Sequence, residues 1–111
     1  MARLVSSVLA SALLRRAEQE GGFGAVLAKG DPTAGAIAVI LAEKGRKARF
    51  LERVMQADDS YAWQSTREDV ENEEEFEKFL ARRRKSDPDL WILELDIASA
   101  ERFAAEMNES G

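Results

Sequence analysis

The sequence predicts an α+β domain in which a mostly antiparallel five-stranded sheet carries three helices gathered mainly on one face, in the order α-β-β-β-β-α-β-α. Residues 73–96 change from a charged helical pattern to an alternating apolar pattern at a turn centred on Pro88. Residues 36–43 are almost continuously apolar, which is typical of a central strand covered on both faces. Three short connections between residues 23 and 65 predict a four-strand antiparallel meander, to which a C-terminal strand is added.

A first helix is expected to begin at Ser6 or Ser7, either of which can act as its N-cap, and to end near Glu20. Its end is marked by Gly21-Gly22, a pair suited to the left-handed conformation that follows many helices. The residues expected on its buried face are apolar and recur at helical spacing: Val5, Val8, Leu9, Ala12, Leu13 and Ala17.

Four strands of the expected meander follow, each bounded by residues that favour turns. They are predicted at residues 23–29, 36–43, 47–57 and 61–65. In the third strand the period is two, so Phe50 and Leu51 should face opposite sides of the sheet.

The second helix has the strongest local signals in the chain. Asn72 can act as its N-cap, paired with Glu75 three residues later. Its first turn is acidic and its last turn, residues 82–85, is basic, which is the arrangement that the helix dipole favours. The apolar residues expected to dock this helix on the sheet are Phe76, Phe79 and Leu80.

The fifth strand is expected at residues 90–95, with one fully apolar face made by Trp91, Leu93 and Leu95. A last short helix should follow, capped by Asp96 or Ser99 and ending near Met107. No repeat, low-complexity linker or second domain interrupts these elements, so residues 1–111 are expected to form a single domain.

Composition excludes several kinds of chemistry. The chain has no cysteine and no histidine, which excludes thiol chemistry, thiolate zinc sites and histidine-dependent acid–base or metal chemistry. The net charge of −5 argues against a general nucleic-acid binder. Residues 1–56 carry nine basic and five acidic side chains, whereas residues 57–111 carry seven and sixteen. Such asymmetry favours either ion pairing between the two halves or a partner of matching charge.

The N-terminus has a weak likeness to a secretory signal. Residues 4–14 are largely apolar and include Ala10-Ser11-Ala12, but cleavage there would leave an apolar core that is too short and too rich in serine. A core-facing helix explains the same residues better. No apolar run approaches the ~20 residues that cross a bilayer, so we expect a cytoplasmic protein with no membrane association.

Three segments in order resemble the bacterial domain-of-unknown-function family 1491, found in alphaproteobacteria. They are Leu13-Leu14-Arg15-Arg16 with Gly21-Gly22-Phe23, then residues 29–36 (KGDPTAGA), and finally residues 87–94 (DPDLWILE). The resemblance covers nearly the whole chain. It implies a small stand-alone cytoplasmic protein with no assigned activity, and it supplies no catalytic residue.

Two arginine clusters are the clearest candidates for a site, because guanidinium groups grip phosphate or carboxylate with two parallel hydrogen bonds. The candidate anion-binding residues are Arg15, Arg16, Arg82 and Arg83. The alternative is that these residues compensate the dipoles of two helix ends and pair with the acidic half of the chain. Residues 68–77 can be read as a site for a hard cation, but they lack the spacing of a calcium loop and suit a helix N-terminus better.

The sequence therefore favours a small non-enzymatic interaction protein, with no cofactor, that binds another protein or itself. An exposed sheet edge or the basic end of the second helix are the candidate surfaces. The alternative from another class is binding of an anionic ligand or nucleic acid through the arginine clusters, although nucleic acid is not the expected partner. A third hypothesis, an enzyme that uses carboxylates or lysine alone, has no motif to support it.

Overall fold

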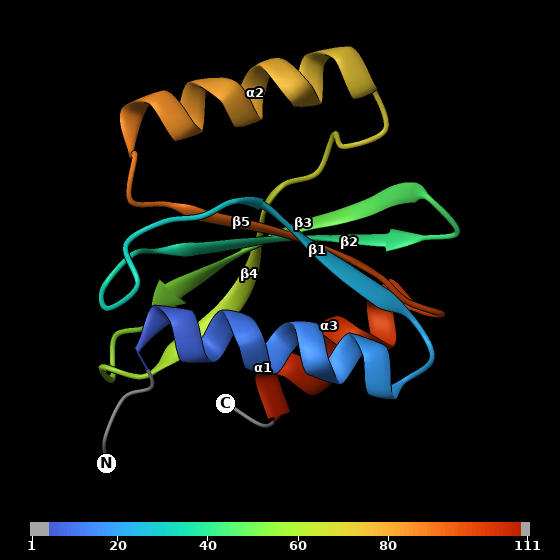
Figure 1. Ribbon diagram of the computed structural model, residues 1–111, viewed down its shortest axis with the longest axis horizontal. Coiled ribbons are helices and arrows are strands. Elements are labelled where there is room, and N and C mark those ends of the chain that lie inside the picture. The colour runs from blue at the N-terminus through green and yellow to red at the C-terminus, as the bar shows by residue number, and fades with distance from the viewer. Residues whose placement is uncertain (1–4, 110–111) are drawn as a thin grey trace.

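The strands form one mixed sheet with helices on both faces, as the computed structural model shows for residues 5–109 (Figure 1). The elements follow the predicted order: α1 (Ser6–Gln19), β1 (Phe23–Ala28), β2 (Ile37–Glu43), β3 (Arg46–Met55), β4 (Tyr61–Arg67), α2 (Glu73–Ser86), β5 (Trp91–Asp96) and α3 (Ala100–Glu109). Helices α1 and α3 lie on one face and α2 on the other. The predicted α+β class is confirmed.

The strand order is β1-β5-β2-β3-β4, so β5 lies between β1 and β2. It pairs antiparallel with β1 and parallel with β2. The predicted four-strand meander is therefore wrong in its first step, and only β2, β3 and β4 are successive antiparallel neighbours. A strand that is apolar on both faces suits an interior position, which β5 occupies with Leu93 and Leu95 fully buried.

The connection between β1 and β2 is shaped by the start of β5 and is not a tight hairpin. The N–H of Asp31 donates to the carbonyl of Asp89 at 3.0 Å, and the N–H of Trp91 donates to the carbonyl of Ala36 at 2.8 Å. The indole Nε1 of Trp91 also donates to the carbonyl of Asp31 at 2.7 Å. These long-range bonds hold β1 and β2 apart by the width of one strand, which explains why a turn rich in glycine and proline does not join neighbours here.

Two apolar cores lie on the two faces of the sheet. In β2, Val39 packs towards α1 and α3, while Ile40 packs towards α2. On the α2 side, the ring of Phe50 meets Phe76 and Phe79 edge to face, with centroids 5.6 and 5.3 Å apart. The predicted docking of the second helix through Phe76, Phe79 and Leu80 is confirmed, and Phe50 and Leu51 face opposite cores as expected.

Helix α1 is rotated relative to the prediction. Leu13 and Ala17 are buried, but Val5, Val8 and Ala12 are exposed, and the N-cap is Val5, which makes no side-chain cap. Neither Ser6 nor Ser7 caps the helix. The hydroxyl of Ser6 instead donates to the carbonyl of Gly35 at 2.6 Å, and this buried bond turns Ser6 and Ala10 inward. The rotation leaves an apolar stripe facing water: Val5, Val8 and Ala12.

The ends of the other helices agree with the prediction. Asn72 caps α2 by accepting from the N–H of Glu75 at 3.2 Å, and Ser99 caps α3 by accepting from the N–H of Arg102 at 3.2 Å. Gly21 has a φ of +86° just after α1, the left-handed conformation expected there. Within residues 5–109, no helix has both the length and the apolar character needed to cross a membrane.

The substitution Phe50→Ala should reveal how much the α2-side core contributes to stability. Phe50 is fully buried between two aromatic rings, so its removal should lower the free energy of unfolding by about 3–5 kcal/mol. Met55→Ala is the matched control, because Met55 lies on the same strand with 49 % of its surface exposed. Chemical denaturation measures both, and equal effects of the two substitutions would contradict the packing described.

Candidate interaction surface

The two outer strands of the sheet are β1 and β4, and the edge of β4 is covered at Trp63. The side-chain amide of Asn108 on α3 forms two hydrogen bonds with the backbone of Trp63. Its Oδ1 accepts from the N–H of Trp63 at 2.7 Å, and its Nδ2 donates to the carbonyl of Trp63 at 3.1 Å. Asn108 therefore takes the place that the peptide group of an added strand would occupy. Such covering of an edge prevents pairing with another chain.

The edge of β1 has no such cover. Apart from its ladder with β5, the backbone of residues 23–28 forms no hydrogen bond with any residue between 5 and 109. The strand has the sequence FGAVLA and carries no charge. Phe23, Val26 and Leu27 are 67 %, 43 % and 51 % exposed. Exposed edge strands normally carry charges or proline, so an uncharged apolar edge indicates a surface for pairing.

The register of β1 decides which face each residue occupies. Gly24 lies opposite Leu95, and a Cβ at Gly24 would lie 2.7 Å from both Leu14 and Leu95, so Gly24 faces α1 at close approach. Val26 lies opposite Leu93 and faces the same side, while Ala25 lies opposite Glu94 on the α2 side. A bulge follows between Val26 and Ala28, and Leu27 is its extra residue.

The apolar stripe of α1 does not adjoin the edge of β1. Leu14 lies on the β1 side of the helix, close to Gly24, and at 3.6 residues per turn Val5, Val8 and Ala12 lie nearly opposite Leu14. Helix α1 packs on β1 and β5, and Figure 1 shows it beneath β1, joined to it by the turn at Gly21-Gly22. Val8 is 48 % exposed and Val5 is 41 % exposed. We call the exposed apolar residues of β1 the β1 surface; its members are Phe23, Val26 and Leu27.

The predicted anion-binding arginines do not converge. Arg15 and Arg16 belong to α1 and Arg82 and Arg83 to α2, and these helices lie on opposite faces of the sheet. Arg16 pairs with Glu106 at 3.3 Å and Glu20 at 3.4 Å, and Arg83 pairs with Glu52 at 2.5 Å. The pairs to Glu106 and Glu52 each join the two halves of the chain, but only Arg16–Glu106 joins a base of the basic half to an acid of the acidic half, as the uneven charge predicted. Arg15 and Arg82 are exposed.

Arg84, which belonged to the same basic run, has a structural role. Its guanidinium donates to the carbonyl of Leu90 at 3.0 Å, to the carbonyl of Lys29 at 2.9 Å and to the carbonyl of Pro88. It thereby joins the end of α2 to the turn before β5 and to the end of β1. This role could not be predicted from the sequence, because the three carbonyls come together only in the folded chain.

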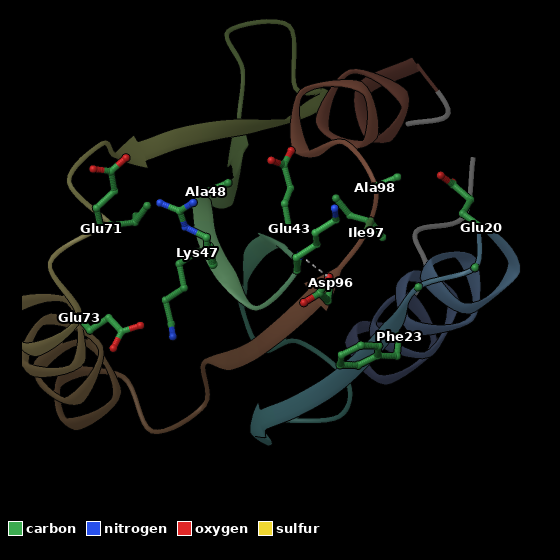
Figure 2. Close-up of a pocket in the computed structure, with 15 residues that line it drawn as sticks. Glu20, Phe23, Glu43, Lys47, Ala48, Glu71, Glu73, Asp96, Ile97 and Ala98 are labelled. Carbon is green, nitrogen blue, oxygen red and sulfur yellow. Dashed lines mark hydrogen bonds between the residues drawn. The ribbon is translucent and has the colours of Figure 1, made fainter.

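An open hollow of about 860 Å³ lies at the end of the sheet where β2 and β5 finish (Figure 2). Its most prominent carboxylates hold the fold together: Asp96 accepts from the N–H groups of Lys44 and Gly45, and Glu43 accepts from the N–H of Ala100 at 2.7 Å. Within the described chain, no three acidic side chains are grouped to hold a metal ion. The hollow therefore shows no built binding site, although Phe23 lines its β1 side.

The turn between β3 and β4 contains a carboxyl with a shifted pKa. The hydroxyl of Ser60 donates to Asp58 at 2.6 Å and its backbone N–H donates at 3.0 Å, and these bonds lower the pKa of Asp58. Because the pKa is lower in the folded state, the stabilisation is present above the unfolded-state pKa and is lost as the pH falls. This arrangement stabilises a turn and supplies no acid or base for catalysis.

The fold and the β1 surface define a small α+β domain in which one outer strand is covered at Trp63 and the edge of the other is open. Residues 4–105 match the sequence model described as protein of unknown function DUF1491, so the chain belongs to this family. The resemblance of the three sequence segments is thereby confirmed. No protein with curated annotation matches the sequence.

Solved structures of similar proteins share the fold. A DUF1491 family protein from Caulobacter crescentus CB15, solved by crystallography, is 28 % identical with a TM-score of 0.79, and covers 91 % of this chain and 94 % of its own. An NMR structure of a DUF1491 family protein from the same organism has 27 % identity, a TM-score of 0.78 and 94 % coverage of both chains. The solution structure of a protein from A. tumefaciens has 34 % identity, a TM-score of 0.75 and 93 % coverage of both.

The substitution Asn108→Ala should open the β4 edge. It removes two hydrogen bonds to the backbone of Trp63, so stability should fall by about 1 kcal/mol and the Trp63 amide should exchange faster with solvent. Amide exchange measured by NMR checks this, with the exposed neighbour Glu109→Ala as control. Unchanged exchange at Trp63 in Asn108→Ala would show that Asn108 does not protect the edge.

Proposed function

We propose that the protein is a non-enzymatic interaction module that self-associates through the open edge of β1. The observation that carries this proposal is the contrast between the two edges of one sheet. Asn108 covers the edge of β4 at Trp63, whereas β1 presents its backbone and three exposed apolar side chains. Addition of a strand to such an edge satisfies the free backbone groups and buries the side chains together.

A second copy of the chain suits this edge. Most soluble oligomers are twofold symmetric homodimers whose contact uses the same patch on both subunits. A twofold contact needs a self-complementary surface, and an uncharged antiparallel strand meets that need because its backbone pattern repeats when the strand is reversed. Pairing there would also remove Phe23 and Leu27, the most exposed large apolar residues of the strand, from water.

The arginine alternative has less support from the geometry. Arg16 and Arg83 already have carboxylate partners, and the two candidate pairs lie on opposite faces. No single ligand of small size reaches both.

Self-association can be tested by sedimentation equilibrium over a range of protein concentrations. The wild-type chain should populate a dimer, and Leu27→Lys should shift it to monomer, because a lysine at an edge resists pairing. Met55→Lys is the matched control: Met55 is 49 % exposed, close to the 51 % of Leu27, and lies on β3. A wild-type chain that stays monomeric at millimolar concentration would contradict the proposal, as would equal effects of the two lysine substitutions.

A further inference from the structure

We infer that the self-associated form is a twofold dimer in which β1 pairs antiparallel with β1 of a second copy, centred on Ala25, with the two α1 helices side by side beneath the joined sheet. This inference rests on the proposed function, because it specifies the geometry of that contact.

Symmetry and side-chain direction restrict how two β1 strands can pair. Two antiparallel edge strands related by a twofold axis share one continuous sheet, and the axis runs perpendicular to that sheet. Residues that lie opposite each other across an antiparallel pair point to the same face. In β1, Gly24 and Val26 face α1, while Phe23 and Ala25 face the α2 side. Residues therefore pair only with others of the same face, and one residue must lie on the axis opposite its own copy.

Ala25 is the residue of β1 that best suits a position on the twofold axis. Centring on Ala25 pairs Gly24 with Val26 of the second copy, so that a large side chain lies beside a glycine. It also pairs Phe23 with Leu27, so that two exposed apolar side chains lie opposite each other. Centring on Gly24 shortens the overlap to residues 23–25 within the strand. Centring on Val26 brings the bulge at Leu27 into the middle of the pairing, where it disrupts the ladder. Ala25 is exposed and small, which suits a close approach of two copies.

The position of α1 in the dimer follows from the same axis. Because the twofold axis is perpendicular to the sheet, both α1 helices lie on the same face, one on each side of the axis. Neighbouring strands are about 4.8 Å apart. Helix α1 packs on both β1 and β5, so its axis lies inward of β1, and two copies set back by about half a strand spacing are roughly 9–10 Å apart. That spacing is typical of packed helices, so the two α1 helices contact each other on the side of the helix that carries Leu14, while the stripe of Val5, Val8 and Ala12 stays outside the contact.

Charged residues of opposite sign flank the uncharged strand β1. Glu20, which also pairs with Arg16 at 3.4 Å, precedes β1, and Lys29 follows it. With Ala25 on the axis, Lys29 of one copy extends towards Gly21 of the other, next to Glu20. The dimer thus contains two symmetric contacts of opposite charge at the two ends of an uncharged strand, which favours the antiparallel orientation.

The absence of cysteine makes the axis directly testable, because a single introduced cysteine is the only thiol. Cα atoms facing each other in an antiparallel pair are about 4.5–5.5 Å apart, within the range that a disulfide spans. Ala25→Cys should therefore form a covalent dimer under mild oxidation at least about tenfold faster than Met55→Cys, because a held pair has an effective concentration in the millimolar range. If the chain is dimeric but the two variants crosslink at equal rates, the Ala25 axis is wrong and the proposed function stands. If it is monomeric, both fail.

A charge exchange tests the orientation independently. Glu20→Lys and Lys29→Glu alone should each weaken the homodimer about tenfold, because each places like charges at both ends of the contact. An equimolar mixture of the two variants should restore the wild-type affinity as a heterodimer, which native mass spectrometry distinguishes by mass. A wild-type dimer whose affinity neither substitution changes, or a mixture that forms no heterodimer, would overturn the antiparallel arrangement.

Discussion

The position of β5 is the constraint on which the rest of the structure depends. The strand enters between β1 and β2, and each of its faces supplies a different core: Leu93 and Leu95 pack towards α1 and α3, and Ile92 packs towards α2. The connection from β1 to β2 is held around its start by bonds to Asp89 and Trp91. Burial of apolar side chains on both faces is the main driving force here, and it can be satisfied only by a strand inside the sheet.

This placement also decides what happens at the edges. Once β5 fills the inner side of β1, no other strand within residues 5–109 pairs with the outer side of β1, while Asn108 of α3 covers the edge of β4 at Trp63. The contrast between the edges thus follows from the topology. The exposure of Val8 on α1 has a separate cause, since the buried bond of Ser6 fixes the rotation of that helix.

The sequence predicted what depends on near neighbours along the chain. The cap at Asn72, the acidic first turn of α2 and the spacing of Phe76 and Leu80 are local signals, and the structure agrees with them. The four-strand meander failed because strand order depends on long-range burial, and short connections normally join neighbours. The rotation of α1 was missed because hydrophobicity alone favours Val8 over Ser6 as a buried residue, whereas a distant carbonyl accepts the Ser6 hydroxyl.

The candidate surface was predictable only in part. An exposed sheet edge was expected, and the uncharged run of residues 23–28 is a visible signal for it, but Asn108 could not be connected with Trp63 before the fold was known. The most direct test of the account is amide hydrogen exchange, resolved by NMR and measured at low and high protein concentration. The outward-facing amides of β1 should become more protected as concentration rises, while the Trp63 amide should not change. Exchange in β1 that is independent of concentration would contradict the account.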